Sequence, residues 1–131
     1  MKKIIVLLTV FSIWKSLYAQ VTPLPLAHSH NDYEQTKPLI GALENGFTSI
    51  EADVLYIYGK LYVGHNMPNK KRHKLKTLTK QYLKPLYKRF KANEGEIYKG
   101  YQGEFYLWID IKFESSRTYT ALRKVLLPFK E

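Results

Sequence analysis

The 131 residues are enough for one small domain, and they include no cysteine, which excludes disulfide bonds and lipid-modified cysteines. The formal net charge of +10 favours anionic partners. No recognised nucleic-acid-binding motif accompanies this charge, so we expect no nucleic acid partner.

The first 19 residues have the features of a secretory signal peptide, namely a basic start, a short apolar stretch and small residues before Gln20. Lys15 interrupts the apolar stretch too early for a membrane span, which needs about 20 apolar residues. An uncleaved anchor is the alternative. We expect export to the periplasm or the extracellular space, with residues 20–131 forming the folded domain at a formal charge of +7.

The first half of this domain alternates between strand and helix patterns. Residues 26–27 form a short apolar strand, residues 38–45 have helical spacing with proline in the first turn, and residues 47–58 predict a longer strand. A Gly-Lys turn at 59–60 leads directly into apolar residues 61–63, which predicts a hairpin or two closely joined strands.

The second half begins with a polar loop at residues 67–76. Apolar residues then recur at helical spacing over 77–92, where Pro85 is expected to kink or split the helix. An apolar strand at 105–112 ends in charged residues, and a last helix follows within residues 115–128.

Eleven lysines and arginines, but no acidic residue, lie between Lys60 and Lys91. This basic segment could attract an anionic surface such as phospholipid, which predicts peripheral membrane contact. A solvated helix face followed by a basic loop is the alternative explanation.

Strands that alternate with helices predict a parallel α/β sheet, in which functional sites form beyond the carboxyl ends of the strands. A complete (β/α)8 barrel needs about 250 residues. We therefore expect a fold of the (β/α)8 TIM-barrel type of which this chain holds only the N-terminal half. Its last strand should leave an open apolar edge, which requires further chain or a partner and favours self-association.

Polar side chains gather where three successive segments end. Glu51 and Asp53 are two residues apart on a predicted strand, so their side chains leave the same face and can converge on one cation. The segment His28-Ser29-His30-Asn31-Asp32 ends the preceding strand, and Gly64-His65-Asn66 follows the next one. For an isolated Glu-x-Asp pair, an ordinary solvated strand end is the alternative.

These segments resemble the phosphatidylinositol phospholipase C-like phosphodiesterases, a superfamily that includes glycerophosphodiester phosphodiesterases and sphingomyelinase D-type enzymes. The resemblance covers residues 26 to about 113 and rests on Ala27-His28, Glu51-Ala52-Asp53-Val54, Gly64-His65 and Asp110-Ile111-Lys112. The sequence after His28 departs from the His-Arg-Gly start of typical glycerophosphodiesterases, so the resemblance does not imply one particular substrate.

The resemblance implies a metal-dependent phosphodiester hydrolase, or a cyclising lyase, that acts on glycerophosphodiesters or phospholipid headgroups. It implies acid-base catalysis by His28 and His65. It also implies a metal site made of Glu51, Asp53 and Asp110, and a substrate site to which we assign His30, Asn31 and Lys112. Alternatively, His30 is a second metal ligand or a hydrogen bond donor that shapes the turn. Asn31 could instead bind the metal through its amide.

The residue types agree with this chemistry. Carboxylate oxygens favour the hard cations Mg²⁺ and Ca²⁺, which stabilise the negative charge that develops on a phosphodiester. Histidine has an ordinary pKa of about 6.5, so one imidazole can activate a nucleophile while the other protonates the leaving oxygen. The nucleophile is either water or a neighbouring hydroxyl of the substrate, which would form a cyclic phosphate first.

Two other interpretations use the same residues differently. The pair His28 and His30 also resembles the start of metal-dependent amidohydrolases and histidinol-phosphatase-like phosphoesterases, which use zinc or manganese. That interpretation leaves Glu51, Asp53 and Asp110 unexplained. Alternatively, the chain is a truncated module without catalytic activity that binds an anionic lipid or polymer.

Overall fold

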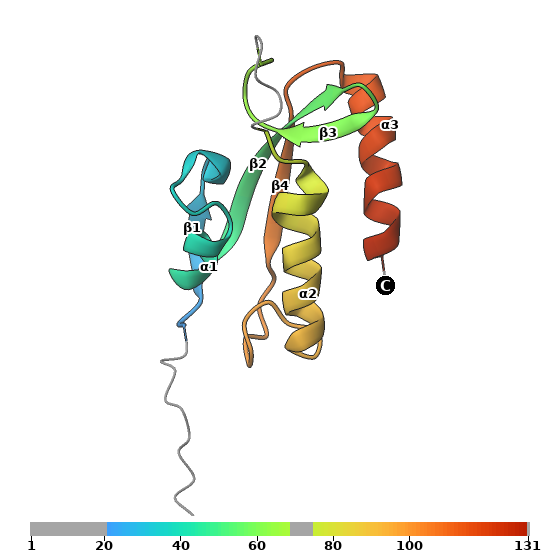
Figure 1. Ribbon diagram of the computed structural model, residues 1–131. Coiled ribbons are helices and arrows are strands. Elements are labelled where there is room, and N and C mark those ends of the chain that lie inside the picture. Colours follow the sequence, from blue (N-terminus) through green and yellow to red (C-terminus); the bar gives the residue numbers. More distant parts are fainter. Residues whose placement is uncertain (1–20, 69–74, 131) are drawn as a thin grey trace, which may run out of the picture.

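The computed structural model describes residues 21–68 and 75–130, so the predicted signal peptide lies outside the described residues. They form four strands and three α-helices, together with short 3-10 and π-helical turns (Figure 1). In chain order the elements are β1 (Leu24–Ser29), the 3-10 turn η1 (Asp32–Glu34), α1 (Ile40–Glu44), β2 (Phe47–Ile57), β3 (Lys60–Val63), the π-helical turn η3 (Thr79–Leu83), α2 (Lys84–Ala92), β4 (Tyr106–Ile111), α3 (Ser115–Leu126) and the 3-10 turn η4 (Leu127–Phe129). None of the described helices combines the length and the apolar character needed to span a membrane.

The long strand β2 organises the sheet. It pairs in parallel with β1 and β4, and its carboxyl-terminal part pairs antiparallel with β3. The prediction of half a (β/α)8 TIM barrel is therefore wrong. The described strands form a mixed four-stranded sheet, and no closed barrel exists among them.

The turn between β2 and β3 explains why the parallel barrel prediction failed. Tyr58 and Gly59 both have positive φ angles, 45° and 81°, as in the tight turns of β-hairpins. A connection this short can only return the chain antiparallel, because a parallel neighbour needs a crossover of a dozen residues or more. The hairpin itself was predicted from the Gly-Lys dipeptide and is confirmed.

The hydrophobic core lies on one face of the sheet. Ile50, Ala52 and Val54 of β2 are fully buried, and alternate residues of β4 pack with them. Side chains from α1, η3, α2 and α3 complete this cluster, and Figure 1 shows α2 alongside β4 and α3 beside β3. The alternation of a strand directs the intervening residues of β2 and β4 to the opposite face.

The predicted helix over residues 77–92 is present without a break, but its winding changes just before Pro85. A π-helical turn, η3, precedes α2, and Pro85 occupies the first turn of α2. Proline lacks the backbone N–H that a continuous α-helix would use at this position, so the two segments adopt different hydrogen-bonding patterns.

Candidate functional site

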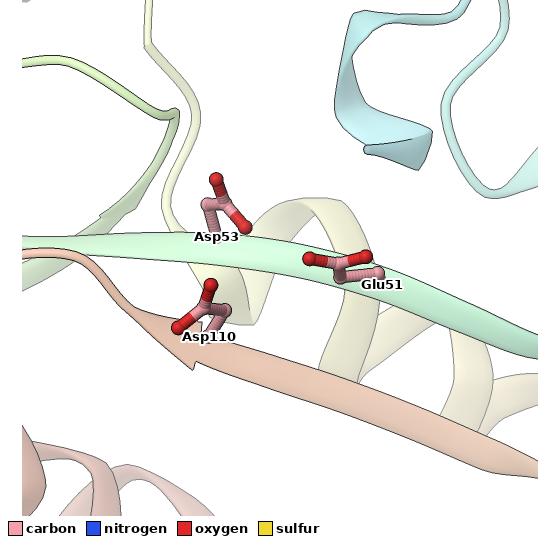
Figure 2. Close-up of side chains that lie close together, drawn as sticks. All are labelled: Glu51, Asp53 and Asp110. Carbon is pink, nitrogen blue, oxygen red and sulfur yellow. The ribbon is translucent and has the colours of Figure 1, made fainter. Parts of the chain in front are cut away.

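Three carboxylates meet on the face of the sheet opposite the core (Figure 2). Glu51 and Asp53 come from β2, and Asp110 of β4 lies directly opposite Asp53 in the parallel register. One oxygen from each side chain lies within 4.8 Å of the other two. The strand register therefore brings together the three residues that the sequence predicted as metal ligands.

Asp53 is fully buried, and its two oxygens have different surroundings. Oδ2 accepts hydrogen bonds from the Tyr33 hydroxyl and from His65 Nδ1, each at 2.8 Å, and lies 3.3 Å from Lys112 Nζ. Oδ1 is buried and has no hydrogen bond partner among the described residues. Burial by itself raises the pKa of Asp53, but the three donors outweigh burial and hold this pKa below its ordinary value of 3.8.

Oδ1 of Asp53, which has no hydrogen bond partner among the described residues, indicates whether these residues fit a metal ion. A buried carboxylate oxygen without a hydrogen bond is destabilising, because it has lost its water and gained nothing in return. A cation that contacts Oδ1 of Asp53 would compensate this loss, and Glu51 and Asp110 offer further oxygens nearby. The donor set therefore fits a hard divalent cation.

His65 is held by Asp53 through one ring nitrogen. The ionised Asp53 can only accept a hydrogen bond from His65 Nδ1. A neutral His65 ring therefore carries its proton on Nδ1. Its Nε2 atom then has a free lone pair. The His65 side chain is about half exposed, at 49%, so a ligand can reach it.

His28 belongs to a chain of hydrogen bonds that crosses the sheet. The indole Nε1 of Trp108 donates to Ser49 Oγ at 3.0 Å, and Ser49 Oγ lies 2.8 Å from His28 Nδ1. Indole can only donate, so the serine hydroxyl is free to donate onward to His28. This direction leaves the proton of a neutral His28 on Nε2, which lies 3.4 Å from Glu51 Oε2.

The three predicted substrate-binding residues lie around the carboxylates. Lys112 Nζ donates to Asp110 Oδ2 at 2.6 Å, and this hydrogen bond raises the pKa of the lysine. His30 is largely exposed, and its Nε2 lies 3.6 Å from Glu51 Oε2. Asn31 has a more distant connection, because its side-chain amide lies 3.1 Å from the Tyr33 hydroxyl, whose single proton is donated to Asp53 at the shorter distance of 2.8 Å.

The His-x-His interpretation finds less geometric support. His28 and His30 both approach Glu51, with ring centroids 6.4 Å apart. Yet within the described part of the chain, the residues whose ligand atoms converge on one point are the three carboxylates, and neither histidine is among them.

Asp32 is a second fully buried carboxylate near the site, and its oxygens all have partners. Oδ2 accepts from the backbone N–H of Leu39 at 2.6 Å and from the Tyr82 hydroxyl at 2.7 Å, while Oδ1 accepts from Ser29 Oγ at 3.0 Å. These bonds fasten the loop between β1 and α1 to η3. The loop carries Tyr33, so Asp32 positions a side chain that contacts Asp53.

Sequence reasoning missed several residues that shape the site. Ser49 and Trp108 could have been found from strand alternation. Ser49 lies two residues before Glu51 and Trp108 lies two residues before Asp110, so each shares a strand face with a predicted metal ligand. Tyr33 and Tyr82 give no such signal, because their contacts with Asp53 and Asp32 depend on how a loop and a π-helical turn fold back.

An open cleft of about 550 Å³ lies against this face of the sheet. It is lined by His28, Ser49, Glu51, Trp108, Ile109 and Asp110. Its volume lies in the range of small-molecule binding sites. Carboxylates, an imidazole and an exposed indole thus share one cavity.

Comparison with known proteins gives a family match over most of the chain. A family model described as an AIM6-like phosphodiesterase domain matches residues 15–131. An "Altered inheritance of mitochondria protein 6 homolog" of Arthroderma benhamiae is 31% identical over 129 residues, which covers 85% of this chain and 40% of the relative. "Altered inheritance of mitochondria protein 6" of Lachancea thermotolerans is 36% identical over 130 residues, covering 88% of this chain and 30% of the relative.

"Altered inheritance of mitochondria protein 6" of Saccharomyces cerevisiae is 45% identical over 80 residues, covering 60% of this chain and 20% of the relative. This chain therefore spans less than half the length of the curated relatives it matches. No solved structure matches. The comparisons confirm a phosphodiesterase-like family, but they do not place the chain specifically in the phosphatidylinositol phospholipase C-like superfamily.

Proposed function

Because the chain belongs to the AIM6-like phosphodiesterase domain family, we propose that it carries the site of a metal-dependent phosphodiesterase. Glu51, Asp53 and Asp110 would hold a divalent cation, Mg²⁺ or Ca²⁺, and the substrate is a glycerophosphodiester or a phospholipid-derived phosphodiester. When bound, such a cation stabilises the negative charge that develops on the phosphate.

The asymmetry of Asp53 carries this proposal. One oxygen accepts from Tyr33 and His65, whereas the other is buried beside two further carboxylates and has no hydrogen bond partner within residues 21–68 and 75–130. A carboxylate with a purely structural role would use both oxygens for protein hydrogen bonds. The unsatisfied oxygen of Asp53 supports a ligand role for this residue.

The hydrogen bonds of the two histidines support different tasks. His65 keeps its proton on Nδ1, so its free Nε2 is suited to accept a proton from the nucleophile. In its imidazolium form His28 carries a proton on each ring nitrogen and directs Nε2–H toward the cleft and Glu51, so it is suited to protonate the leaving oxygen and return to neutral imidazole. Lys112 adds a positive charge for the phosphate.

Further parts of the proposal concern the cellular setting. We also propose that segment 1–19 directs export of the chain. The basic segment would then contact an anionic membrane, and an open sheet edge would allow self-association. Whether water or a substrate hydroxyl attacks the phosphorus decides between direct hydrolysis and cyclic phosphate formation. The second outcome would place the chemistry with the phosphatidylinositol phospholipase C-like enzymes.

A phosphodiester panel tests the proposed activity. The full chain is incubated with bis(4-nitrophenyl) phosphate, glycerophosphocholine and lysophosphatidylcholine, with added Mg²⁺ or Ca²⁺ and with a chelator. We expect turnover that requires the cation, and a loss of about 100-fold or more in His65→Ala and His28→Ala. Tyr119→Ala, which replaces an exposed residue of α3 outside the lining of the cleft, is the matched control and should retain full turnover.

The non-catalytic alternative gives the opposite result. A module that only binds anionic surfaces would bind phosphatidylserine vesicles without turning over any ester, and the two histidine variants would bind as tightly as the wild type. That combination would overturn the proposed function.

A further inference from the structure

Trp108 is an exposed tryptophan with a fixed orientation. Trp108 is 59% exposed, although burial of an indole is normally favourable. Its Nε1 atom donates to Ser49 Oγ, which anchors one edge of the ring to the sheet. The indole therefore presents apolar surface to solvent in a defined position.

This indole lies beside the carboxylates rather than elsewhere on the surface. Trp108 is directly opposite Glu51 in the register of β2 and β4, and Asp110 follows two residues later on the same face. All three residues line the same cleft. On this face of β4 the charged side chain of Asp110 is followed, two residues earlier in the strand, by the aromatic side chain of Trp108.

Tyr106 extends the aromatic surface away from the carboxylates. Its ring centroid lies 6.4 Å from that of Trp108, with an interplanar angle of 33°, and the residue is 48% exposed. Trp108 and Tyr106 together form what we call the aromatic platform, at the opposite end of the row from Asp110. Flat apolar groups gain contact with such rings by stacking.

Resting on the proposed function, we propose that the aromatic platform binds the organic substituent of the phosphodiester and makes the site selective for an aryl or comparably flat apolar group. With the phosphate at Glu51, Asp53 and Asp110, a substituent directed along β4 toward its amino-terminal end meets Trp108 first. The cleft volume of about 550 Å³ accommodates a phosphate together with a group of this size.

Two phosphonate monoanions separate the platform from the phosphate site. The monomethyl esters of phenylphosphonic and methylphosphonic acid carry the same charge and differ only in the group attached to phosphorus. Their dissociation constants are measured by calorimetry on the Mg²⁺-loaded full chain. We expect the phenyl compound to bind about tenfold more tightly, as stacking on an aromatic side chain allows.

The variants assign this preference to the ring. Trp108→Leu should reduce the phenyl preference to about twofold or less, whereas Trp108→Phe, which keeps a flat ring but loses the N–H group, should retain most of it. Ser49→Ala tests whether the hydrogen bond merely orients the ring. Tyr119→Leu removes a comparably exposed aromatic residue, at 57%, from α3 and should leave the preference unchanged.

Each failure has its own signature. Equal affinity of the two compounds for wild type, or a phenyl preference that survives Trp108→Leu, would overturn the aromatic platform while leaving metal-dependent turnover intact. If neither compound binds and no phosphodiester is hydrolysed, the proposed function itself fails and the inference fails with it. Circular dichroism spectra establish that each variant is folded, and Trp108→Phe provides a conservative second variant.

Discussion

Two fully buried aspartates, Asp32 in the loop after β1 and Asp53 in β2, lie in neighbouring parts of the molecule and differ in their hydrogen bonds. Both oxygens of Asp32 accept hydrogen bonds, from Ser29, Leu39 and Tyr82. At Asp53, Tyr33 and His65 both donate to Oδ2, and Oδ1 has no donor among the described residues.

This difference separates a structural carboxylate from a candidate ligand better than burial does. A fully satisfied carboxylate such as Asp32 has no oxygen left for a cation, so it holds the loop in place. Asp53 is oriented by its satisfied oxygen while the other remains available. If this interpretation is correct, substitutions at the two residues should damage different properties of the protein.

The largest effect is expected from Asp53→Asn. The amide has the size of the carboxylate but lacks its negative charge, so we expect affinity for Mg²⁺ and kcat/KM on bis(4-nitrophenyl) phosphate to fall about 100-fold or more. Calorimetry with Mg²⁺ and steady-state kinetics measure the two quantities. Wild-type cation affinity in this variant would remove Asp53 from the ligand set and end the distinction between the two aspartates.

Asp32→Asn should reverse the pattern. Three donors lose an ionised acceptor in a buried position, so we expect the free energy of unfolding to fall by about 3 kcal/mol. The Mg²⁺ affinity of the folded variant should change little. Urea unfolding measures the first quantity, and calorimetry at a temperature where the variant is folded measures the second. A variant as stable as wild type would show that the loop does not depend on Asp32.

Alkaline pH should affect the Asp32 region through Tyr82. Burial, followed by the hydrogen bond to Asp32 and its charge, raises the pKa of Tyr82 well above its ordinary value of 10.0. Between the two values the unfolded state has lost a proton that the folded state keeps, so stability decreases as pH rises above about 10. Over two pH units one such tyrosine removes about 2 kcal/mol.

The measurement is urea unfolding between pH 9 and 12 for wild type and Tyr82→Phe. The variant should lose less stability over this interval, although it starts from a lower value. Tyr98 is also buried, and burial raises its pKa to about 12, so part of the alkaline loss should persist in the variant. Parallel curves for the two proteins would contradict the contribution of Tyr82.

The sequence predicted the parts of the site that depend on strand periodicity. Glu51 and Asp53 share a face because they are two residues apart, and Asp110 joins them because β4 pairs in parallel with β2. The family resemblance, not periodicity, supplied Asp110 as a ligand, and it also supplied His28 and His65, which lie within 3.4 Å of Glu51 and Asp53 respectively. Their catalytic roles remain predictions, since geometry alone does not measure turnover.

The sequence could not predict features that depend on how separate segments fold together. The barrel expectation rested on the alternation of strands with helices, although the hairpin at residues 59–60 was itself predicted, and this turn adds β3 to the sheet as an antiparallel strand. Asp32 could not be distinguished from an ordinary turn residue, because its partners Leu39 and Tyr82 lie on other elements. The different roles of two aspartates thus arise from tertiary contacts and not from residue type.

The smallest effect is expected where the two regions meet, at Tyr33. Its hydroxyl donates to Asp53 Oδ2 at 2.8 Å, and the residue lies in η1 immediately after Asp32. Tyr33→Phe removes this one hydrogen bond while Asp53 keeps His65 and Lys112, so we expect a loss of stability of about 1 kcal/mol and a change in Mg²⁺ affinity of about threefold or less. Urea unfolding with and without Mg²⁺ measures both quantities. If instead Tyr33→Phe weakened cation binding as much as Asp53→Asn, the loop would be part of the metal site, and the separation between a structural and a ligand aspartate would fail at this residue.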